Sequence, residues 1–334
     1  MIPSALIETL QCAISEHIPV HIWGASGVGK SDLGRHVARI MNRQFADLRA
    51  VLLDPVDLRG LPMVLGDKTH WVIPEFLPRD GEGILLVDEL VSAPQMVQAA
   101  FYQLILDRRV GEYVLPDGWD VIAAGNPASE RGVHFAMPRP LRNRFMHVTL
   151  EPDLKDWCSW AVVNRIHPAI IAFLRFRPHL LSEPGGKDEN AWPSPRSWEM
   201  ASKVLWAWGA RHNNSFSDEL LIFQLNGVIG EGATSELIAF LRLFMELPST
   251  DEIVLNPMTA PIPEPEAVSA AIAVATALGR VMTDTNIIQI DKYLSRMDTE
   301  FAVMAMRDAS KRDRMISKTP TYINFNIRNQ QLVA

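Results

Sequence analysis

The chain has 334 residues, of which 48% are apolar and 21% charged, and its formal net charge at pH 7 is −7. This composition is typical of globular proteins and excludes a disordered or fibrous chain. Because the length exceeds what one hydrophobic core usually organises, we expect a main domain and at least one smaller domain. The charges are spread along the chain without a tail rich in lysine and arginine, so a protein partner is favoured over nucleic acid.

No stretch of the sequence reaches the roughly 18 consecutive apolar residues that a membrane-spanning helix needs. The N-terminal segment lacks the basic region and apolar run of a signal peptide. We therefore expect a cytoplasmic protein that does not enter a membrane. Its two cysteines, Cys12 and Cys158, are too few and too isolated for a disulfide framework or a zinc cluster. We predict that both are small core residues.

Short apolar runs alternate with helical patterns up to about residue 150, which predicts an α/β fold with a mainly parallel sheet. The five predicted strands cover residues 20–23, 50–53, 84–87, 121–124 and 146–150. Beyond them the apolar spacing becomes helical, and the predicted helices cover residues 153–164, 168–181, 196–211, 218–229 and 235–245. Five prolines between residues 248 and 265 predict a loop or linker. Two or more helices follow, at about 265–282 and 291–315.

A phosphate-binding motif follows the first predicted strand directly and precedes a helical pattern. It consists of Gly24, Ala25, Ser26, Gly27, Val28, Gly29, Lys30 and Ser31. The glycines let the backbone curl so that its N–H groups point at the β- and γ-phosphates of a nucleotide. Lys30 adds a mobile positive charge, and Ser31 offers a hydroxyl to Mg²⁺. The motif predicts that the chain binds ATP together with Mg²⁺.

Polar side chains end two further predicted strands. The apolar run that begins at Gly83 ends in Asp88 and Glu89, and the run at 121–124 is followed by Asn126. Ligands bind at the carboxyl ends of strands in open α/β sheets, so these groups are predicted beside the phosphates. Asp88 would then hold Mg²⁺, directly or through water, and Glu89 would orient and polarise the attacking water. Asn126 would hydrogen-bond the γ-phosphate or that water.

In this order the residues resemble the AAA+ ATPases, with a Walker A motif at 24–31, a Walker B motif at 84–89 and Asn126 as sensor 1. The segment 138–145 is similar to the part of that family that carries the arginine finger. By position Arg144 is the first candidate for the finger, and Arg142 is the second. In AAA+ proteins the finger enters the site of the neighbouring subunit, where its planar guanidinium neutralises charge on the transferring phosphoryl group. The resemblance thus implies a homo-oligomeric ring, usually a hexamer, with active sites at the interfaces.

Other segments resemble the MoxR-like, dynein-related branch of these ATPases. Residues 193–197 look like its sensor 2 motif, in which Arg196 at a helix start would face the γ-phosphate. The resemblance implies hairpin insertions at about 54–78 and 109–119. It also implies a P-loop NTPase core of three αβα layers with a parallel five-stranded sheet at 1–151, an all-α lid at 152–247, the proline-rich linker at 248–265 and a C-terminal helical extension at 266–334.

A MoxR-like assignment implies an ATPase that remodels, activates or assembles a partner protein, such as one with a von Willebrand factor A-like domain. Trp71 and its neighbours in the first insertion are candidates for contact with that partner. One alternative is a nucleic-acid motor or a restriction-type NTPase with the same core. A small-molecule kinase leaves Asn126, the two finger candidates and Arg196 without a joint explanation. A scaffold that does not hydrolyse ATP is disfavoured because Glu89 is intact.

Overall fold

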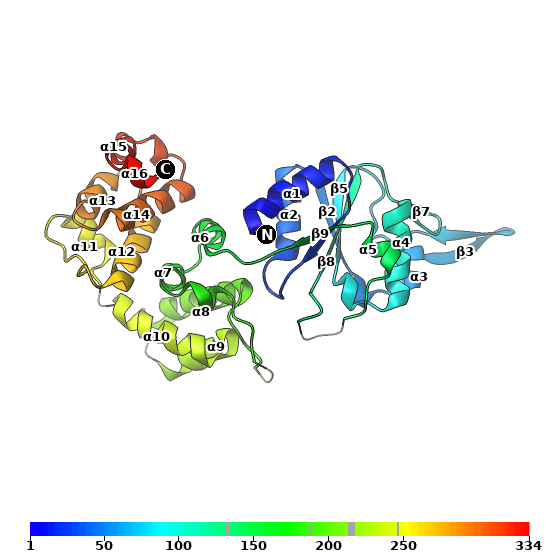
Figure 1. Cartoon of the computed structure of the whole chain (residues 1–334), viewed down its shortest axis with the longest axis horizontal. Coiled ribbons are helices and arrows are strands. Elements are labelled where there is room, and N and C mark those ends of the chain that lie inside the picture. Colours follow the sequence, from blue (N-terminus) through cyan, green and yellow to red (C-terminus); the bar gives the residue numbers. More distant parts are fainter. Residues whose placement is uncertain (131–133, 187–188, 213–217, 246, 334) are drawn as a thin grey trace. The chain divides into compact units, whose positions relative to one another are not determined.

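The computed structural model describes residues 1–130, 134–186, 189–212, 218–245 and 247–333. They form two compact units, Met1–Pro152 and Asp153–Ala334 (Figure 1). Among the described residues, no helix is both long and apolar enough to cross a membrane.

A parallel five-stranded sheet forms the centre of the first unit, with the strand order β2-β5-β8-β1-β9 (Figure 1). The strands are β1 (Val20–Trp23), β2 (Gln44–Arg49), β5 (Gly83–Asp88), β8 (Trp119–Gly125) and β9 (Met146–Thr149). The strand that leads into the phosphate-binding motif, β1, lies between β8 and β9. On its other side β8 pairs with β5, which carries the two acids, so both strands that end in predicted site residues lie near β1.

Helices cover both faces of this sheet, as the alternation of side chains along β5 shows. Ile84 and Leu86 belong to the core built with helices α1 (Pro3–Ser15) and α2 (Lys30–Ile40). The residues between them, Leu85 and Val87, belong to the core built with α4 (Gln95–Asp107) and α3 (Pro55–Arg59). Because successive side chains of a strand point to opposite faces, a strand buried on both faces reads as a continuous apolar run. The predicted three-layer αβα fold of the P-loop type is confirmed.

The second predicted strand was placed wrongly. The structure forms β2 from residues 44–49, whereas residues 50–52 form a 3₁₀ turn and Leu52 is 73% exposed. In the sheet β2 is an edge strand that pairs only with β5, and most of its side chains are exposed or half-buried. An edge strand of this kind needs no apolar run, so hydropathy did not reveal it.

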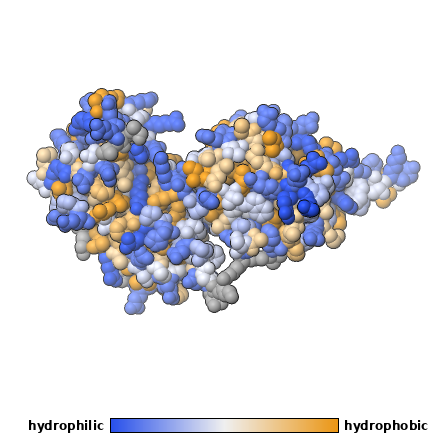
Figure 2. All heavy atoms as spheres, in the orientation of Figure 1, coloured by the Kyte–Doolittle hydropathy of each residue, from blue (hydrophilic) through white to orange (hydrophobic). Residues whose placement is uncertain are grey.

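Two antiparallel hairpins interrupt the first unit. The longer one joins β3 (Leu61–Leu65) to β4 (Lys68–Val72), and the shorter joins β6 (Arg109–Val110) to β7 (Tyr113–Val114). In Figure 1 the β3–β4 hairpin extends away from the sheet, and Figure 2 shows hydrophilic residues at its end. All five β3 side chains are exposed even though the strand is apolar, with Val64 75% exposed. The longer hairpin therefore presents apolar surface to solvent.

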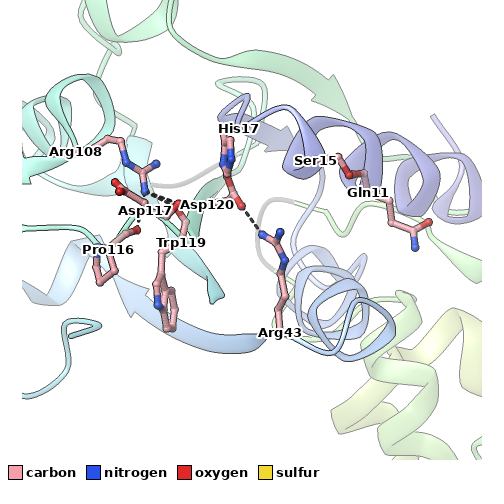
Figure 3. A network of polar contacts seen from close by, with 9 residues as sticks. All are labelled: Gln11, Ser15, His17, Arg43, Arg108, Pro116, Asp117, Trp119 and Asp120. Carbon is pink, nitrogen blue, oxygen red and sulfur yellow. Dashed lines mark hydrogen bonds and ion pairs between the residues drawn. The ribbon is translucent and has the colours of Figure 1, made fainter. Parts of the chain in front are cut away.

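A polar network fastens the end of the sheet where the strands begin (Figure 3). Asp120, near the start of β8, is only 4% exposed and accepts hydrogen bonds from Arg43 Nη1 at 2.6 Å and His17 Nδ1 at 2.8 Å. Arg43 follows α2 and His17 follows α1, so one carboxylate fixes the ends of both helices. Beside it, Arg108 donates to the backbone carbonyls of Pro116 and Trp119.

The second unit is helical and has two hydrophobic cores. One surrounds Trp198 and the other surrounds Tyr293. Its helices are α6 (Leu154–Val163), α7 (Pro168–Phe176), α8 (Pro195–His212), α9 (Glu219–Ile229), α10 (Glu231–Met245), α11 (Thr250–Leu255), α12 (Val268–Val281), α13 (Ile287–Leu294), α14 (Thr299–Arg312), α15 (Pro320–Arg328) and α16 (Gln330–Val333).

Three expectations for the helical region were wrong. The proline-rich stretch contains helix α11, which Ser249 caps by accepting from the backbone N–H of Glu252. The helix predicted from residue 168 ends at Phe176, and a 3₁₀ turn continues to Leu181. The helix predicted at 291–315 is two helices, α13 and α14. Prolines and short polar breaks set limits on where helices begin and end, but side-chain caps decide the outcome.

The two cysteines differ in their environment. Cys158 is buried as predicted, but Cys12 is exposed, so the prediction for Cys12 was wrong. The buried side of α1 consists of Leu6, Leu10, Ala13 and Ile14, and Cys12 lies outside that stripe. The apolar face of this helix was already complete without the cysteine.

Candidate nucleotide-binding site

The predicted nucleotide groups meet at one edge of the sheet. Parallel strands place all their carboxyl ends on the same side, and three of them deliver polar residues there. The P-loop, residues 24–31, follows β1; Asp88 ends β5; Asn126 follows β8. In register Trp23 lies opposite Gly125, and the N–H of Gly24 donates to the carbonyl of Gly125 at 3.3 Å. The P-loop therefore begins directly beside Asn126.

The P-loop backbone depends on its glycines. Gly27 and Gly29 have φ angles of 79° and 95°, in the left-handed region that side chains disfavour. Gly29 is the residue before α2, so the curl leads directly into the start of that helix, where N–H groups are unpaired and the helix dipole is positive. Val28 is buried against the sheet and anchors the loop. The result is an N-terminal helix site suited to an anion.

Lys30 lies inside this curl and is 9% exposed. Its Nζ donates to the carbonyl oxygens of Gly24 at 2.7 Å and Ala25 at 3.0 Å, and to Asn126 Oδ1 at 2.8 Å. An ammonium group has three N–H donors, and these three acceptors suit them. The structure thus brings the predicted P-loop lysine and the predicted sensor 1 residue into direct contact.

Ser31 and Asp88 also meet, since Ser31 Oγ donates to Asp88 Oδ2 at 2.6 Å. A hydroxyl and a carboxylate at this distance are hard oxygen ligands of the kind that Mg²⁺ prefers. In phosphate-binding sites Mg²⁺ usually takes one or two carboxylates and completes its shell with water and phosphate oxygens. The residues present therefore fit a magnesium ion that is shared with a nucleotide.

Glu89 is exposed and has a left-handed backbone, with φ of 57° and ψ of 30°. Its N–H donates to Asp88 Oδ1 at 2.9 Å. A residue other than glycine in this conformation costs roughly 1 kcal/mol, and such strain gathers at functional sites. The bend turns the chain sharply after β5, directly behind Asp88, and the Glu89 side chain is exposed there.

The two arginine-finger candidates lie in the segment that leads into β9. Both are exposed, and they precede Met146, which pairs with Val20 at the start of β1. The P-loop begins after the last residue of β1, so roughly 10 Å of strand separates it from the backbone at Met146. Arg142 nevertheless lines a pocket together with Trp23, the last residue of β1. Arg142 donates to the carbonyl of Met137 at 3.2 Å. For Arg144, the described part of the chain offers no side-chain hydrogen bond or ion pair.

A hydrogen-bond relay links β1 to the finger segment. Trp23 Nε1 donates to His147 Nδ1 at 3.0 Å, and His147 Nε2 lies 2.8 Å from the carbonyl oxygen of Arg142. Because Nδ1 accepts, the proton of a neutral His147 belongs on Nε2, which then donates to Arg142. The relay was not predicted. It joins residues far apart in the chain, and no sequence pattern marks His147.

Beneath this relay lies a second histidine. His21, on β1, is fully buried, and neither of its ring nitrogens has a hydrogen-bond partner among the described residues. Its pKa is lowered to about 3, mainly by burial and further by the charges of His147 and Lys30. His21 is therefore neutral and packs as an aromatic ring, with its centroid 4.1 Å from that of Trp23.

Arg196 and Glu130 differ in their relation to the P-loop. Arg196 lies in the first turn of α8, in the second unit, and its position is described only within that unit. Glu130, which was not predicted, contacts the P-loop: the N–H of Ser26 donates to Glu130 Oε1 at 3.0 Å and to Oε2 at 3.1 Å. Acidic residues are common in loops, so the sequence offered no signal for this contact.

No protein-family model matches the sequence, and no curated protein is similar to it in sequence. Among solved structures, a protein of Cytophaga hutchinsonii provisionally assigned as an ATPase is 16% identical, with a TM-score of 0.38 over 72% of this chain and 88% of its own. NtrX from Brucella abortus, solved with ADP, is 16% identical, with a TM-score of 0.36 over 98% of this chain and 67% of its own. A mutant of RuvB from Thermotoga maritima is 15% identical, with a TM-score of 0.36 over 97% and 86%. At these values the fold assignment rests on the strand order and the P-loop of this chain itself.

Proposed function

We propose that this chain is a Mg²⁺-dependent ATPase of the AAA+ type. One observation carries the proposal: at one edge of the sheet Lys30 contacts Asn126 and Ser31 contacts Asp88. Phosphate binding, metal binding and γ-phosphate contact need these four side chains within a few ångströms of one another.

In this mechanism the P-loop N–H groups and Lys30 hold the phosphates and oppose their charge. Ser31 and Asp88 would hold Mg²⁺, which would neutralise charge on the phosphate oxygens. Glu89 hydrogen-bonds the attacking water and draws off its proton, and Asn126 orients that water or the γ-phosphate. Glu89 is exposed and directly follows Asp88 in the chain, which supports this role.

We further propose that the ATPase works as a ring, with a hexamer as the expected form, in the manner of the MoxR-like branch. Arg144 lies away from the P-loop of its own subunit, so a role in hydrolysis requires that it enter the site of a neighbour. The ring would act on a protein client, such as one with a von Willebrand factor A-like domain. The exposed apolar β3–β4 hairpin, which includes Trp71, is the surface proposed for that contact.

Nucleotide binding and hydrolysis by three variants test the ATPase. Lys30→Ala should weaken ATP binding by more than about a hundredfold, because a buried cation that opposes the phosphates is lost. Glu89→Gln should still bind ATP but hydrolyse it about 10²- to 10⁴-fold more slowly, the usual range for a lost general base. Lys68→Ala, in the β3–β4 hairpin, is the matched control and should bind ATP normally.

Equal ATP affinity in Lys30→Ala and in the parent chain would refute the nucleotide site. Hydrolysis that needs DNA, with an affinity that falls steeply with salt, would favour the nucleic-acid motor instead.

A further inference from the structure

We propose that the Glu130 carboxylate is bound to the P-loop through the Ser26 N–H in the nucleotide-free chain and that ATP must displace it. The proposal rests on the proposed function and adds a residue that sets the nucleotide affinity of the same site. Glu130 is placed by the loop after β8, outside the motifs that mark the site.

The Glu130 carboxylate is an anion that contacts the loop proposed to bind phosphate. Both carboxylate oxygens of Glu130 lie within hydrogen-bond distance of the Ser26 N–H, at 3.0 and 3.1 Å. Ser26 follows Ala25, whose carbonyl accepts from Lys30, so the contact belongs to the curl that surrounds the ammonium group. A carboxylate is the side chain that most resembles a phosphate in charge and in oxygen acceptors. Glu130 therefore places a negative charge against the loop that is proposed to hold the phosphates.

The loop that carries Glu130 begins at Asn126. The N–H of Glu130 donates to the carbonyl of Pro127 at 2.9 Å, which closes a tight turn directly after the asparagine. The same short segment therefore contacts the P-loop twice, through Asn126 on Lys30 and through Glu130 on Ser26. A phosphate group bound in the P-loop would therefore affect both the Lys30–Asn126 contact and the Ser26–Glu130 contact.

A nucleotide in the P-loop and the Glu130 carboxylate on Ser26 oppose each other. Both are negative, and like charges this close repel. Only chains in which Glu130 has left Ser26 are able to bind ATP, so the apparent ATP affinity is reduced in proportion to the fraction of such chains. From the strength of a charge-assisted hydrogen bond to an exposed amide, we expect this fraction to be roughly one tenth. Removal of the carboxylate charge should therefore tighten ATP binding about tenfold.

The first experiment is an equilibrium titration of the full chain with Mg-ATP, in the Glu89→Gln background so that the nucleotide survives. Glu130→Gln keeps the side-chain shape, and Glu130→Ala removes it. Both should bind ATP about tenfold more tightly than the Glu89→Gln chain. Glu16→Gln is the matched control. It removes an exposed negative charge at the end of α1, before β1 begins and thus at the opposite edge of the sheet, and should leave the affinity unchanged.

Unchanged or weaker ATP affinity in Glu130→Gln and Glu130→Ala would overturn the inference. If the parent chain binds ATP and Lys30→Ala does not, such a result leaves the ATPase proposal intact and removes only the role of Glu130. If the parent chain binds no ATP, both proposals fail together.

A second measurement needs no substitution at Glu130. Hydrogen–deuterium exchange of the parent chain with and without Mg-ATP should show slower exchange in residues 24–31, where phosphate replaces solvent. Residues 127–130 should exchange faster with ATP, because their contact to Ser26 is released. Slower exchange in both segments would mean that Glu130 stays in place when ATP binds, which contradicts displacement.

Discussion

Lys30 and His21 are buried polar side chains of the same unit that meet the cost of burial in different ways. The Nζ of Lys30 donates to three oxygens, which compensate for the burial of the ammonium group. His21 has no acceptor or donor partner among the described residues and loses its charge instead. A buried group without partners changes its protonation state when it can, since burial of an unpaired charge costs more. The charged residue serves the site, and the neutral one fills the core below it.

His21 should make the stability of the chain depend on pH. In the unfolded chain it binds a proton near pH 6.5, but in the folded chain only near pH 3. Between these values the unfolded state binds more protons than the folded state. The contribution of His21 to the free energy of unfolding is therefore complete above pH 6.5 and is lost as the pH falls. From pH 7 to pH 5 the loss is about 2 kcal/mol. In His21→Leu this loss should disappear, which urea unfolding of both chains at the two pH values would measure.

The control for this experiment is His70→Leu, the same substitution at an exposed hairpin position. It should keep the pH dependence of the parent chain. If His21→Leu and the parent chain lose equal stability between pH 7 and pH 5, then His21 is not the buried neutral group described above.

At the scale of elements, the edge where the strands begin serves stability and the opposite edge serves chemistry. The ends of α1 and α2 and the start of β8 all meet at Asp120 (Figure 3). No predicted site residue is part of this network. A substitution there should therefore change folding and leave the geometry of the nucleotide edge alone.

We expect Asp120→Ala to lower the free energy of unfolding by about 3 kcal/mol, because the largely buried Arg43 would lose its counter-charge. The measurement is the urea-unfolding midpoint of the full chain. Arg35→Ala breaks a more exposed pair with Asp47 in the same unit and should cost about 1 kcal/mol or less. Similar losses in the two variants would show that burial does not set the strength of these ion pairs.

Strands buried on both faces were easier to predict than the outermost strand of the sheet. The central strands β1, β5 and β8 read as apolar runs because both faces of each strand pack against helices. At the edge β2 has a mixed sequence, QFADLR, and the apolar run behind it is a turn at the surface. Helix α11 was missed for a related reason, since its six residues are too few to show a helical period.

At the scale of the whole molecule, the first unit carries the two halves of the proposed reaction at opposite edges of its sheet. The P-loop follows the last residue of β1, and Arg144 lies near the first. A head-to-tail arrangement of copies would bring the Arg144 side of one copy to the P-loop side of the next, and such an arrangement forms the proposed ring when its rotation closes. Each proposed active site then depends on two chains.

Mixtures of two inactive variants test this shared site. Arg144→Ala alone and Glu89→Gln alone should each hydrolyse ATP at least a hundredfold more slowly than the parent chain. In an equal mixture, roughly a quarter of the interfaces pair an intact Glu89 with an intact Arg144, so part of the activity should return. The measurement is the ATPase rate of the mixture against the sum of the separate variants. A rate no higher than that sum, with mixed rings demonstrated, would contradict the shared site.

Local order along the chain was enough to predict that the P-loop, Asp88 and Asn126 lie together. A motif of eight neighbouring residues fixes its own backbone, and parallel strands must all end on the same side of the sheet, so these residues had to meet. Three-dimensional packing alone decided the contacts of Glu130 with Ser26 and of His147 with Trp23, which join residues 104 and 124 positions apart. Such contacts depend on the path of loops between strands. Neither hydrophobic periodicity nor motif spacing carries information about that path, because each describes only residues close together in the chain.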